Sequence, residues 1–350
     1  MKLLKRILLI IITLIITPTL LGITQDNLYI SSNAATRKQV NVGVVVSNID
    51  DPYISLVKQS LENIQIKNEN KVKFTFFDSK SNQSIQDETL DTLLRNNIDL
   101  LLVNLVDTSV GAVENIIDKV KQKNIPLILF NSAPSIITNK IKAYNKFIII
   151  TTEPKQAGIL QGKLVVDEWN KNKSSMDKNR DNILQYIMLQ GEINNIGAIE
   201  RTKYSISTIE NAGIKTQALA LQIANWNQEL AKNAIESLFL KYYNKIEVII
   251  ANNDAMAIGA IEALQKYGYN KGDKSKTIPV FGIDGIPAAQ DLIRKGFMTG
   301  TVVEDPDDTA EALYTVGMNL VDNNPPLEDT DYKFDETGII IRIPYHEYTQ

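Results

Sequence analysis

The sequence predicts an α/β protein built from two doubly wound, Rossmann-like lobes. Its 350 residues leave room for two domains, each with its own core. Hydrophobic residues make up 44% and charged residues 22% of the chain, which is the balance of a globular protein and not of a disordered one. Short apolar runs alternate with segments of helical spacing, and this alternation occurs in two successive series.

The first series lies in the N-terminal part of the chain. Four apolar runs are predicted to form strands, each followed by a segment whose apolar residues have helical spacing; they cover residues 40–47, 72–78, 99–106 and 125–131. The runs LLLVNLV and IPLILFN are hydrophobic throughout. Such continuity is typical of strands buried on both faces, as in a parallel sheet that is covered by helices.

The second series predicts a second sheet. Its strands are expected at residues 146–152, 183–190, 216–222, 246–252 and 278–283. Open sheets of this kind bind ligands beyond the carboxyl ends of their strands. The polar residues near those ends are Asp51, Asn104, Asn253 and Asp284. Each of these residues, taken alone, is also typical of a turn or a helix cap.

The composition argues against several classes of function. Lys and Arg number 37 against 41 for Asp and Glu, a formal charge of −4, so nucleic acid is not an expected partner. The chain has no Cys, and His346 is its single His, which argues against Cys nucleophiles, a Ser-His-Asp enzyme and a His-rich zinc site. No G-x-G-x-x-G opens a predicted helix, and GILQGKL at 158–164 departs from the P-loop spacing.

The N-terminal segment, residues 1–35, is interpreted as a targeting segment. Three basic residues precede an aliphatic run at 7–16, and no charge follows until Asp26. Two interpretations stay open. Small residues at 32–34 suit cleavage of a signal peptide, whereas the uncharged stretch 7–24, interrupted by Pro18, has the minimum length of a membrane anchor. Either one predicts an extracytoplasmic protein, released or membrane-anchored.

Four segments resemble the extracytoplasmic glucose/galactose-binding proteins of bacterial sugar importers. They are GVVVSNIDDPYIS at 43–55, VNLVD at 103–107, VIIANNDAMAIGAIEAL at 248–264 and VFGIDGIP at 280–287. The resemblance implies a type I periplasmic-binding fold, in which two lobes are joined by a three-segment hinge. The crossings are expected near Asn131, Glu304 and Ile340. The N-terminal lobe would then comprise 38–130 plus 306–338, and the C-terminal lobe 132–303 plus 341–350.

The resemblance also implies a sugar site in the cleft between the lobes. The apolar faces of a sugar ring stack on aromatic rings, and its hydroxyls suit short, stiff polar side chains. By position, Tyr53 and Trp226 would be the stacking pair. The residues expected to contact sugar hydroxyls are Asp51, Asn104, Arg201, Asn253 and Asp284. Three positions depart from the family pattern. Asn195 replaces a His and is expected to hydrogen-bond to the ligand in its place. Gly197 and Glu304 replace an Asp and an Asn near the anomeric end, where Glu304 is expected to reach the ligand.

A second constellation predicts a structural Ca²⁺ site. In DKNRDNILQ at 177–185, oxygen-bearing side chains at positions 1, 3, 5 and 9 and a backbone carbonyl at position 7 follow the spacing of a calcium loop; they belong to Asp177, Asn179, Asp181, Gln185 and Ile183. Position 12, where an EF-hand has its Glu, is Met188. The resemblance implies that Glu247 closes the loop instead. The alternative is a solvated polar loop.

The function that the resemblance implies is binding of a monosaccharide, a glucose- or galactose-like hexose, without catalysis. Ligand contacts to both lobes would favour a closed form, which a membrane partner then recognises. That partner is either the permease of an ABC importer or, if the N-terminal segment is a retained anchor, a histidine kinase or chemoreceptor. A sugar-responsive repressor of this fold would need a DNA-binding helix pair before Val40, where the sequence has an apolar leader.

Overall fold

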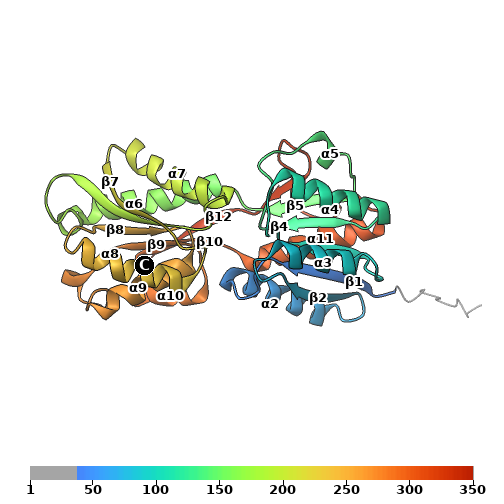
Figure 1. The fold of residues 1–350 in the computed structure, drawn as a ribbon, viewed down its shortest axis with the longest axis horizontal. Coiled ribbons are helices and arrows are strands. Elements are labelled where there is room, and N and C mark those ends of the chain that lie inside the picture. The colour runs from blue at the N-terminus through green and yellow to red at the C-terminus, as the bar shows by residue number, and fades with distance from the viewer. Residues whose placement is uncertain (1–37, 350) are drawn as a thin grey trace, which may run out of the picture. The chain divides into compact units, whose positions relative to one another are not determined.

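Two six-stranded sheets organise the chain, which a computed structural model describes from residue 38 to residue 349 (Figure 1). The targeting segment predicted at 1–35 lies outside the described residues. No helix within residues 38–349 combines the length and the apolar character that crossing a membrane requires.

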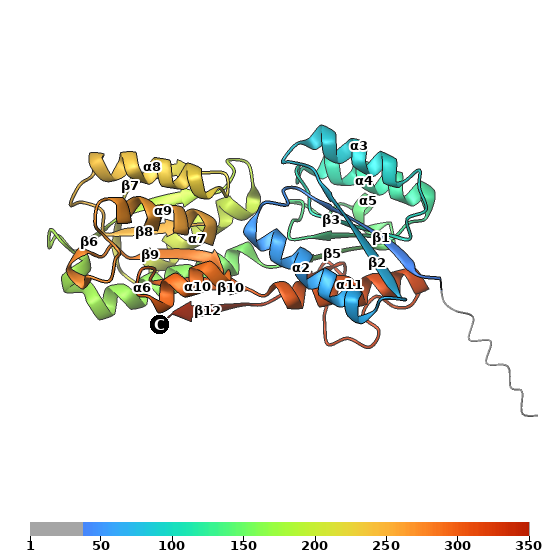
Figure 2. The ribbon, with the colours of Figure 1, turned by 90° about the horizontal axis from the view of Figure 1, so that it is seen from below.

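The first sheet, with its helices, forms the N-terminal lobe. All its strands are parallel, in the order β11-β5-β4-β3-β1-β2. The strands are β1 (Val40–Val46), β2 (Val72–Asp78), β3 (Leu100–Val103), β4 (Leu127–Phe130), β5 (Phe147–Thr151) and β11 (Ile340–Arg342). The helices are α2 (Pro52–Lys67), α3 (Gln83–Leu93), α4 (Val110–Lys123), α5 (Asn139–Lys142) and α11 (Pro306–Asp322). Helices α2 and α11 cover one face of the sheet, and α3 and α4 cover the other (Figures 1 and 2).

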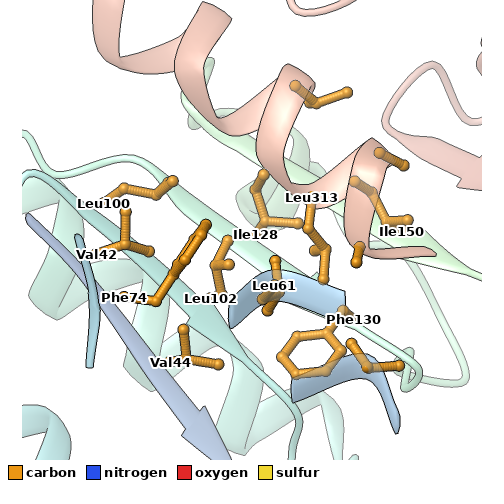
Figure 3. Packing of buried hydrophobic residues seen from close by; sticks show 14 of the residues in the cluster. Val42, Val44, Leu61, Phe74, Leu100, Leu102, Ile128, Phe130, Ile150 and Leu313 are labelled. Atoms are coloured by element: carbon orange, nitrogen blue, oxygen red, sulfur yellow. The ribbon is translucent and has the colours of Figure 1, made fainter. Parts of the chain in front are cut away.

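Packing on both faces explains the continuous apolar runs. In β3, Leu100 and Leu102 belong to the cluster that also contains Leu61 of α2 and Leu313 of α11 (Figure 3). The alternate residues Leu101 and Val103 belong to the cluster on the opposite face. Because successive side chains of a strand point to opposite faces, every residue of β3 is buried.

The second sheet, with its helices, forms the C-terminal lobe. Its order is β12-β10-β9-β8-β6-β7, and β12 is antiparallel to β10. The strands are β6 (Ile183–Gln190), β7 (Lys215–Ile223), β8 (Val248–Ala251), β9 (Val280–Asp284), β10 (Gly300–Glu304) and β12 (Tyr345–Thr349). The helices are α6 (Pro154–Met176), α7 (Ile196–Asn211), α8 (Gln228–Lys241), α9 (Asp254–Lys266), α10 (Pro287–Arg294) and the short 3₁₀ helix η1 (Lys274–Lys276). The predicted class, two doubly wound α/β lobes, is confirmed.

The chain passes between the sheets at three points, and two of these crossings lie at other residues than expected. Strand β5 pairs with β4 in the first sheet, so the first crossing follows Thr151 and not residue 131. Strand β11 pairs with β5, so the last crossing follows Arg342. An apolar run indicates that a strand is buried but not which sheet it joins, and this is why these two boundaries were misplaced. The remaining crossing lies between β10 and α11, at Asp305.

Each crossing carries a proline. Pro154 and Pro306 begin α6 and α11, and Pro344 lies between β11 and β12. Asp305 caps α11 by accepting hydrogen bonds from the backbone N–H groups of Asp307 (2.8 Å) and Asp308 (3.3 Å). Proline restricts φ to about −65°, so these residues limit the conformations that the connecting segments can adopt.

Candidate functional site

The carboxyl ends of strands from both sheets border a cavity of about 690 Å³. The residues from Val40 onward form one compact unit, which contains both lobes and this cavity. Eight of the nine predicted ligand residues line it: Asp51, Tyr53, Asn104, Asn195, Arg201, Trp226, Asn253 and Asp284. The structure therefore brings together residues that are up to 233 positions apart in the chain, Asp51 and Asp284 being the most distant pair.

Three of these residues are also helix caps. One side-chain oxygen of Asp51 accepts hydrogen bonds from the N–H groups of Tyr53 (2.9 Å) and Ile54 (3.0 Å) at the start of α2. Asn195 caps α7 and Asn253 caps α9 in the same manner. The cap and the site are compatible, since each cap uses one oxygen and fixes the side chain at the cavity wall. The cap interpretation and the binding interpretation of the sequence thus apply to the same residues.

Asn104 joins three strand ends of the N-terminal lobe. Its Oδ1 accepts a hydrogen bond from the N–H of Ser47, just beyond β1, and its Nδ2 donates to the carbonyl of Phe130 in β4. Asn104 itself follows β3. A second Nδ2 hydrogen is left for a ligand, because a side-chain amide carries two. Asn104 therefore offers a ligand a donor rather than an acceptor.

Arg201, on α7, is the buried cation of the site. Its Nη1 donates to the carbonyl of Asn252 and its Nη2 donates to the hydroxyl of Tyr345, both at 2.9 Å. The guanidinium lies 3.7 Å from the carboxylate of Asp284 and 3.6 Å from that of Glu304. Within residues 38–349 its Nε has no hydrogen-bond partner. A buried N–H in this state is an open donor for a ligand.

Carboxyl groups outnumber this cation. Burial raises the pKa of Asp51, Asp284 and Glu304, and Arg201 opposes each shift. The shift is largest for Asp284, where Asp254, Asp51 and Glu304 add like-charge repulsion. Carboxylate oxygens accept hydrogen bonds, so the site is rich in acceptors that face a ligand able to donate.

Glu304, unlike the other eight residues, does not line the cavity, and its contact with the ligand stays a prediction. It is the last residue of β10 and its register partner is Tyr345 of β12. The Tyr345 hydroxyl donates to its carboxylate at 3.2 Å, and only 1% of Glu304 is exposed. Pairing in the antiparallel ladder holds Glu304 beside Tyr345. Arg201 contacts Glu304 through Nη2 and Asp284 through Nη1.

The two aromatic residues predicted to stack on a sugar both line the cavity. Tyr53 is buried, and its hydroxyl shares a 3.0 Å hydrogen bond with Thr309 of α11. The Trp226 ring lies 5.7 Å from the Arg201 guanidinium carbon. Trp226 also packs against Gly191 so closely that a Cβ at that position would lie 2.3 Å from the ring. Gly191 therefore provides the space that this ring occupies.

Sequence reasoning missed several residues of the site. Tyr345 links Arg201, Glu304 and Thr152, whose hydroxyl lies 2.6 Å from that of Tyr345. Glu192 and Arg342 line the cavity, and burial raises the pKa of Glu192, which bonds to Asn195 and Trp226. An isolated Tyr near the end of a chain carries no pattern, so only its strand pairing reveals this role.

The predicted calcium loop begins directly after α6 and runs into β6, and Glu247 directly precedes β8. Asp177 accepts hydrogen bonds from the N–H groups of Asp181 (3.0 Å) and Asn182 (3.1 Å), while Glu247 accepts from those of Lys178 (2.8 Å) and Gln185 (3.0 Å). Burial raises the pKa of Glu247 to about 7, and the charges of Asp177 and Asp181 add to the shift. Arg180 and Asn182 have positive φ, which Asn tolerates better than most residues.

The oxygen donors of this loop suit a hard cation, although they do not converge on one point in this structure. Within residues 38–349 no three Asp, Glu or His side chains meet in the geometry of metal ligands. The amide groups of Asn179 and Gln185 instead donate to Asp181, and Gln185 Oε1 is buried with no partner among the described residues. Asn179 Oδ1 accepts from the N–H of Asp181, whereas rotation of the Gln185 amide would present its oxygen beside the Asp181 carboxylate, and oxygen is the ligand that Ca²⁺ prefers.

Comparison with known proteins identifies the family. The model of the periplasmic binding protein domain matches residues 42–325. The D-galactose/methyl-galactoside binding periplasmic protein MglB of Haemophilus influenzae is 34% identical over 316 residues, which are 90% of this chain and 91% of that protein. This chain belongs to the periplasmic binding protein family. The resemblance to the type I periplasmic sugar-binding proteins is confirmed.

More distant members of the family share the fold. The ribose import binding protein RbsB of Bacillus subtilis is 22% identical over 79% of this chain and 80% of its own. An ABC transporter solute binding protein from Bacillus halodurans, solved with myo-inositol, has a TM-score of 0.71 at 24% identity and covers 89% of this chain and 94% of its own. An ABC transporter periplasmic solute binding protein from Actinobacillus succinogenes, solved with D-allose, has a TM-score of 0.72 at 18% identity and covers 89% of this chain and 98% of its own. Members of this family are binding proteins.

Proposed function

We propose that this protein binds a hexose outside the cytoplasm and presents its closed, ligand-bound form to an ABC sugar importer. The observation that carries the proposal is the meeting of Tyr53, Trp226, Arg201 and Asp284 around one cavity bordered by both lobes. The 34% identical relative is a D-galactose/methyl-galactoside binding protein, which supports a hexose as the ligand class.

The chemistry of the cavity supports a polyhydroxylated ligand. Carboxyl groups of Asp51 and Asp284 accept from hydroxyls, while Arg201 Nε and Asn104 Nδ2 donate to them. Tyr53 and Trp226 supply aromatic surface for the C–H faces of a ring. Hydrogen bonds that involve a charged group are about twice as strong as neutral ones, so a small number of them suffices to orient a sugar.

The identity of the hexose depends on the part of the site that departs from the family. Gly197 lines the cavity, and a Cβ there would have only Asn195 Oδ1 (3.1 Å) and Pro154 Cγ (3.8 Å) within 4 Å. The carboxylate that the resemblance implies at this position is missing, and Glu304 lies outside the cavity lining. We expect weaker discrimination at the anomeric end than in glucose/galactose-binding proteins, with tolerance of a substituent there.

The proposal is tested by titrating purified protein with a panel of hexoses, pentoses and cyclitols, using calorimetry and tryptophan fluorescence. The chain has two Trp residues, Trp226 at the cavity and Trp169, which is buried in α6. At least one hexose is expected to bind and change the emission. The change should disappear in Trp226→Phe and persist in Trp169→Phe. A flat calorimetric trace across the whole panel would overturn the proposal.

A second candidate is a membrane-anchored sugar sensor that signals to a histidine kinase or chemoreceptor. The uncharged residues 7–24 favour it, together with the lack of any Cys for a lipid anchor. Sequencing the N-terminus of the protein as the cell exports it distinguishes the two. A start beyond residue 34 supports a released importer protein, and an intact leader supports the sensor.

We also propose that Asp177, Asn179, Asp181, Gln185, Glu247 and the carbonyl of Ile183 bind a structural Ca²⁺. The buried, unpartnered Gln185 Oε1 supports this proposal. Because the ion binds the folded chain, calcium at about 100 times its Kd adds roughly 2.7 kcal/mol to the free energy of unfolding. EDTA is therefore expected to lower the melting temperature, and added Ca²⁺ to restore it.

A matched pair of variants checks the calcium prediction. Glu247→Gln should remove the calcium-dependent rise in melting temperature, because it removes a proposed ligand. Glu336→Gln changes an exposed carboxylate outside the loop and should leave that rise intact. A melting temperature of the unaltered protein that does not respond to EDTA would contradict the proposal.

A further inference from the structure

We propose that Asp254, which does not line the cavity, is the positioning residue that holds Asp284 in the conformation that receives the ligand. The inference rests on the proposed function, since it concerns the same site. It starts from the backbone of Asp284, whose φ is +123° at the end of β9. A residue with a side chain rarely adopts this conformation, and it persists only where its surroundings enforce it.

The carboxylate of Asp254 provides that enforcement. Its Oδ2 accepts a hydrogen bond from the N–H of Ile286 at 2.9 Å, and the carboxylate also bonds to the N–H of Gly285. Both N–H groups belong to the two residues that directly follow Asp284. A group that binds them fixes the direction in which the chain leaves β9, and with it the backbone of Asp284.

The orientation of Asp254 is itself fixed. Its Oδ1 accepts a 2.6 Å hydrogen bond from the hydroxyl of Thr301 in β10, and the residue is fully buried at the first turn of α9. A Cβ at Gly282 would lie 2.1 Å from Asp254 Oδ1, and one at Gly285 would lie 2.6 Å from Val303. The glycines on either side of Asp284 thus make room for this arrangement.

The carboxylate of Asp254 accepts from all of these neighbours. Gly285, Ile286 and Thr301 all present donors to Asp254. An amide in its place has a single acceptor oxygen and no charge; if that oxygen faces the backbone N–H groups, the Thr301 hydroxyl must turn to accept from the amide, and its own hydrogen loses the Asp254 acceptor. Asp254→Asn is therefore expected to weaken the hold on the segment after Asp284, which lets φ of that residue return to the negative range.

A purely structural role makes a different prediction. If Asp254 only stabilises the start of α9, Asp254→Asn lowers the melting temperature. Sugar affinity measured at temperatures at which the variant is folded then stays unchanged. If Asp254 positions Asp284, the variant weakens binding by about tenfold or more, because a charge-assisted contact to the ligand is misplaced. The effect must also depend on the presence of the Asp284 carboxylate.

A double-mutant cycle tests this dependence. Sugar affinity is measured by calorimetry for the unaltered protein, Asp254→Asn, Asp284→Asn and the double variant, well below each melting temperature. We expect Asp254→Asn to cost about tenfold alone and less than about threefold in the Asp284→Asn background, because the group that it positions is then already impaired. Equal losses in both backgrounds, or no loss in either, would overturn the inference.

Two further measurements keep the outcome interpretable. Thr301→Val removes one donor and keeps both backbone bonds, so it should weaken binding by only about two- to threefold. This variant replaces Asp254→Asn in the test if Asp254→Asn fails to fold. A loss of affinity as large as that of Asp284→Asn would argue against the backbone bonds as the means by which Asp254 positions Asp284. A crystal structure of either Asp254→Asn or Thr301→Val shows directly whether φ of Asp284 stays near +123°. Failure of the unaltered protein to bind any sugar would instead remove the proposed function, and this inference with it.

Discussion

Replacing Arg201 by methionine is expected to abolish measurable sugar binding and to destabilise the C-terminal lobe. The change removes the cation that lies within 3.7 Å of Asp284 and Glu304 and leaves two buried carboxylates unpaired. Removing one partner of a buried ion pair typically costs about 3 to 5 kcal/mol. It also removes the donors to Asn252 and Tyr345 and the open Nε.

Arg201→Lys is the matched control for this prediction. Lysine keeps the charge but lacks the planar fork that reaches the Asn252 carbonyl and the Tyr345 hydroxyl together. We expect it to retain most of the stability and lose most of the affinity. Calorimetry and thermal unfolding measure the two effects separately. If Arg201→Met binds sugar within about threefold of the unaltered protein, a difference of roughly 0.6 kcal/mol, Arg201 does not contact the ligand.

Replacing Gly259 by alanine is expected to give the second large effect, on stability alone. Gly259 lies in α9, and a Cβ there would be 2.1 Å from the backbone carbonyl oxygen of Gln228 in α8. The contact is with backbone, so the helices must separate to admit a methyl group. Overpacking of this kind costs about 1 to 3 kcal/mol, and we expect the upper end of that range.

Gly111→Ala provides the comparison. Gly111 is exposed in α4, and a Cβ there would have nothing within 4 Å. Alanine in a helix is favoured over glycine by about 0.5 to 1 kcal/mol, so this variant should be slightly more stable. Chemical denaturation measures both. A Gly259→Ala variant as stable as the unaltered protein would mean that α8 and α9 are not held together as closely as the structure shows.

Local pattern was sufficient to predict the two α/β lobes and the polar residues at strand ends that line the cavity, whereas the other predicted ligand residues came from the family resemblance. Runs such as LLLV in β3 report burial on both faces, because every residue of that strand contacts one helical layer or the other. Asp51, Asn253 and Asp284 were predicted because parallel strands end at a common edge, where a polar side chain is available to a ligand.

Position along the chain could not indicate which sheet a strand joins or which way a side chain points. Strands β5 and β11 join the N-terminal sheet through hydrogen bonds to partners elsewhere in the chain, which apolarity alone does not specify. Glu304 matched a ligand position by its place in the sequence, yet its pairing with Tyr345 places its carboxylate outside the cavity lining.

The sequence by itself determined the class of fold, the family resemblance and the residue types available to a ligand, because each depends on periodicity or on local motifs. The tertiary structure alone decided the crossings, the place of Glu304, the network around Arg201 and the contact of Asp254 with the segment after Asp284. These features depend on hydrogen bonds and burial between residues that lie 20 to 193 positions apart, and such pairings arise only when the chain is folded.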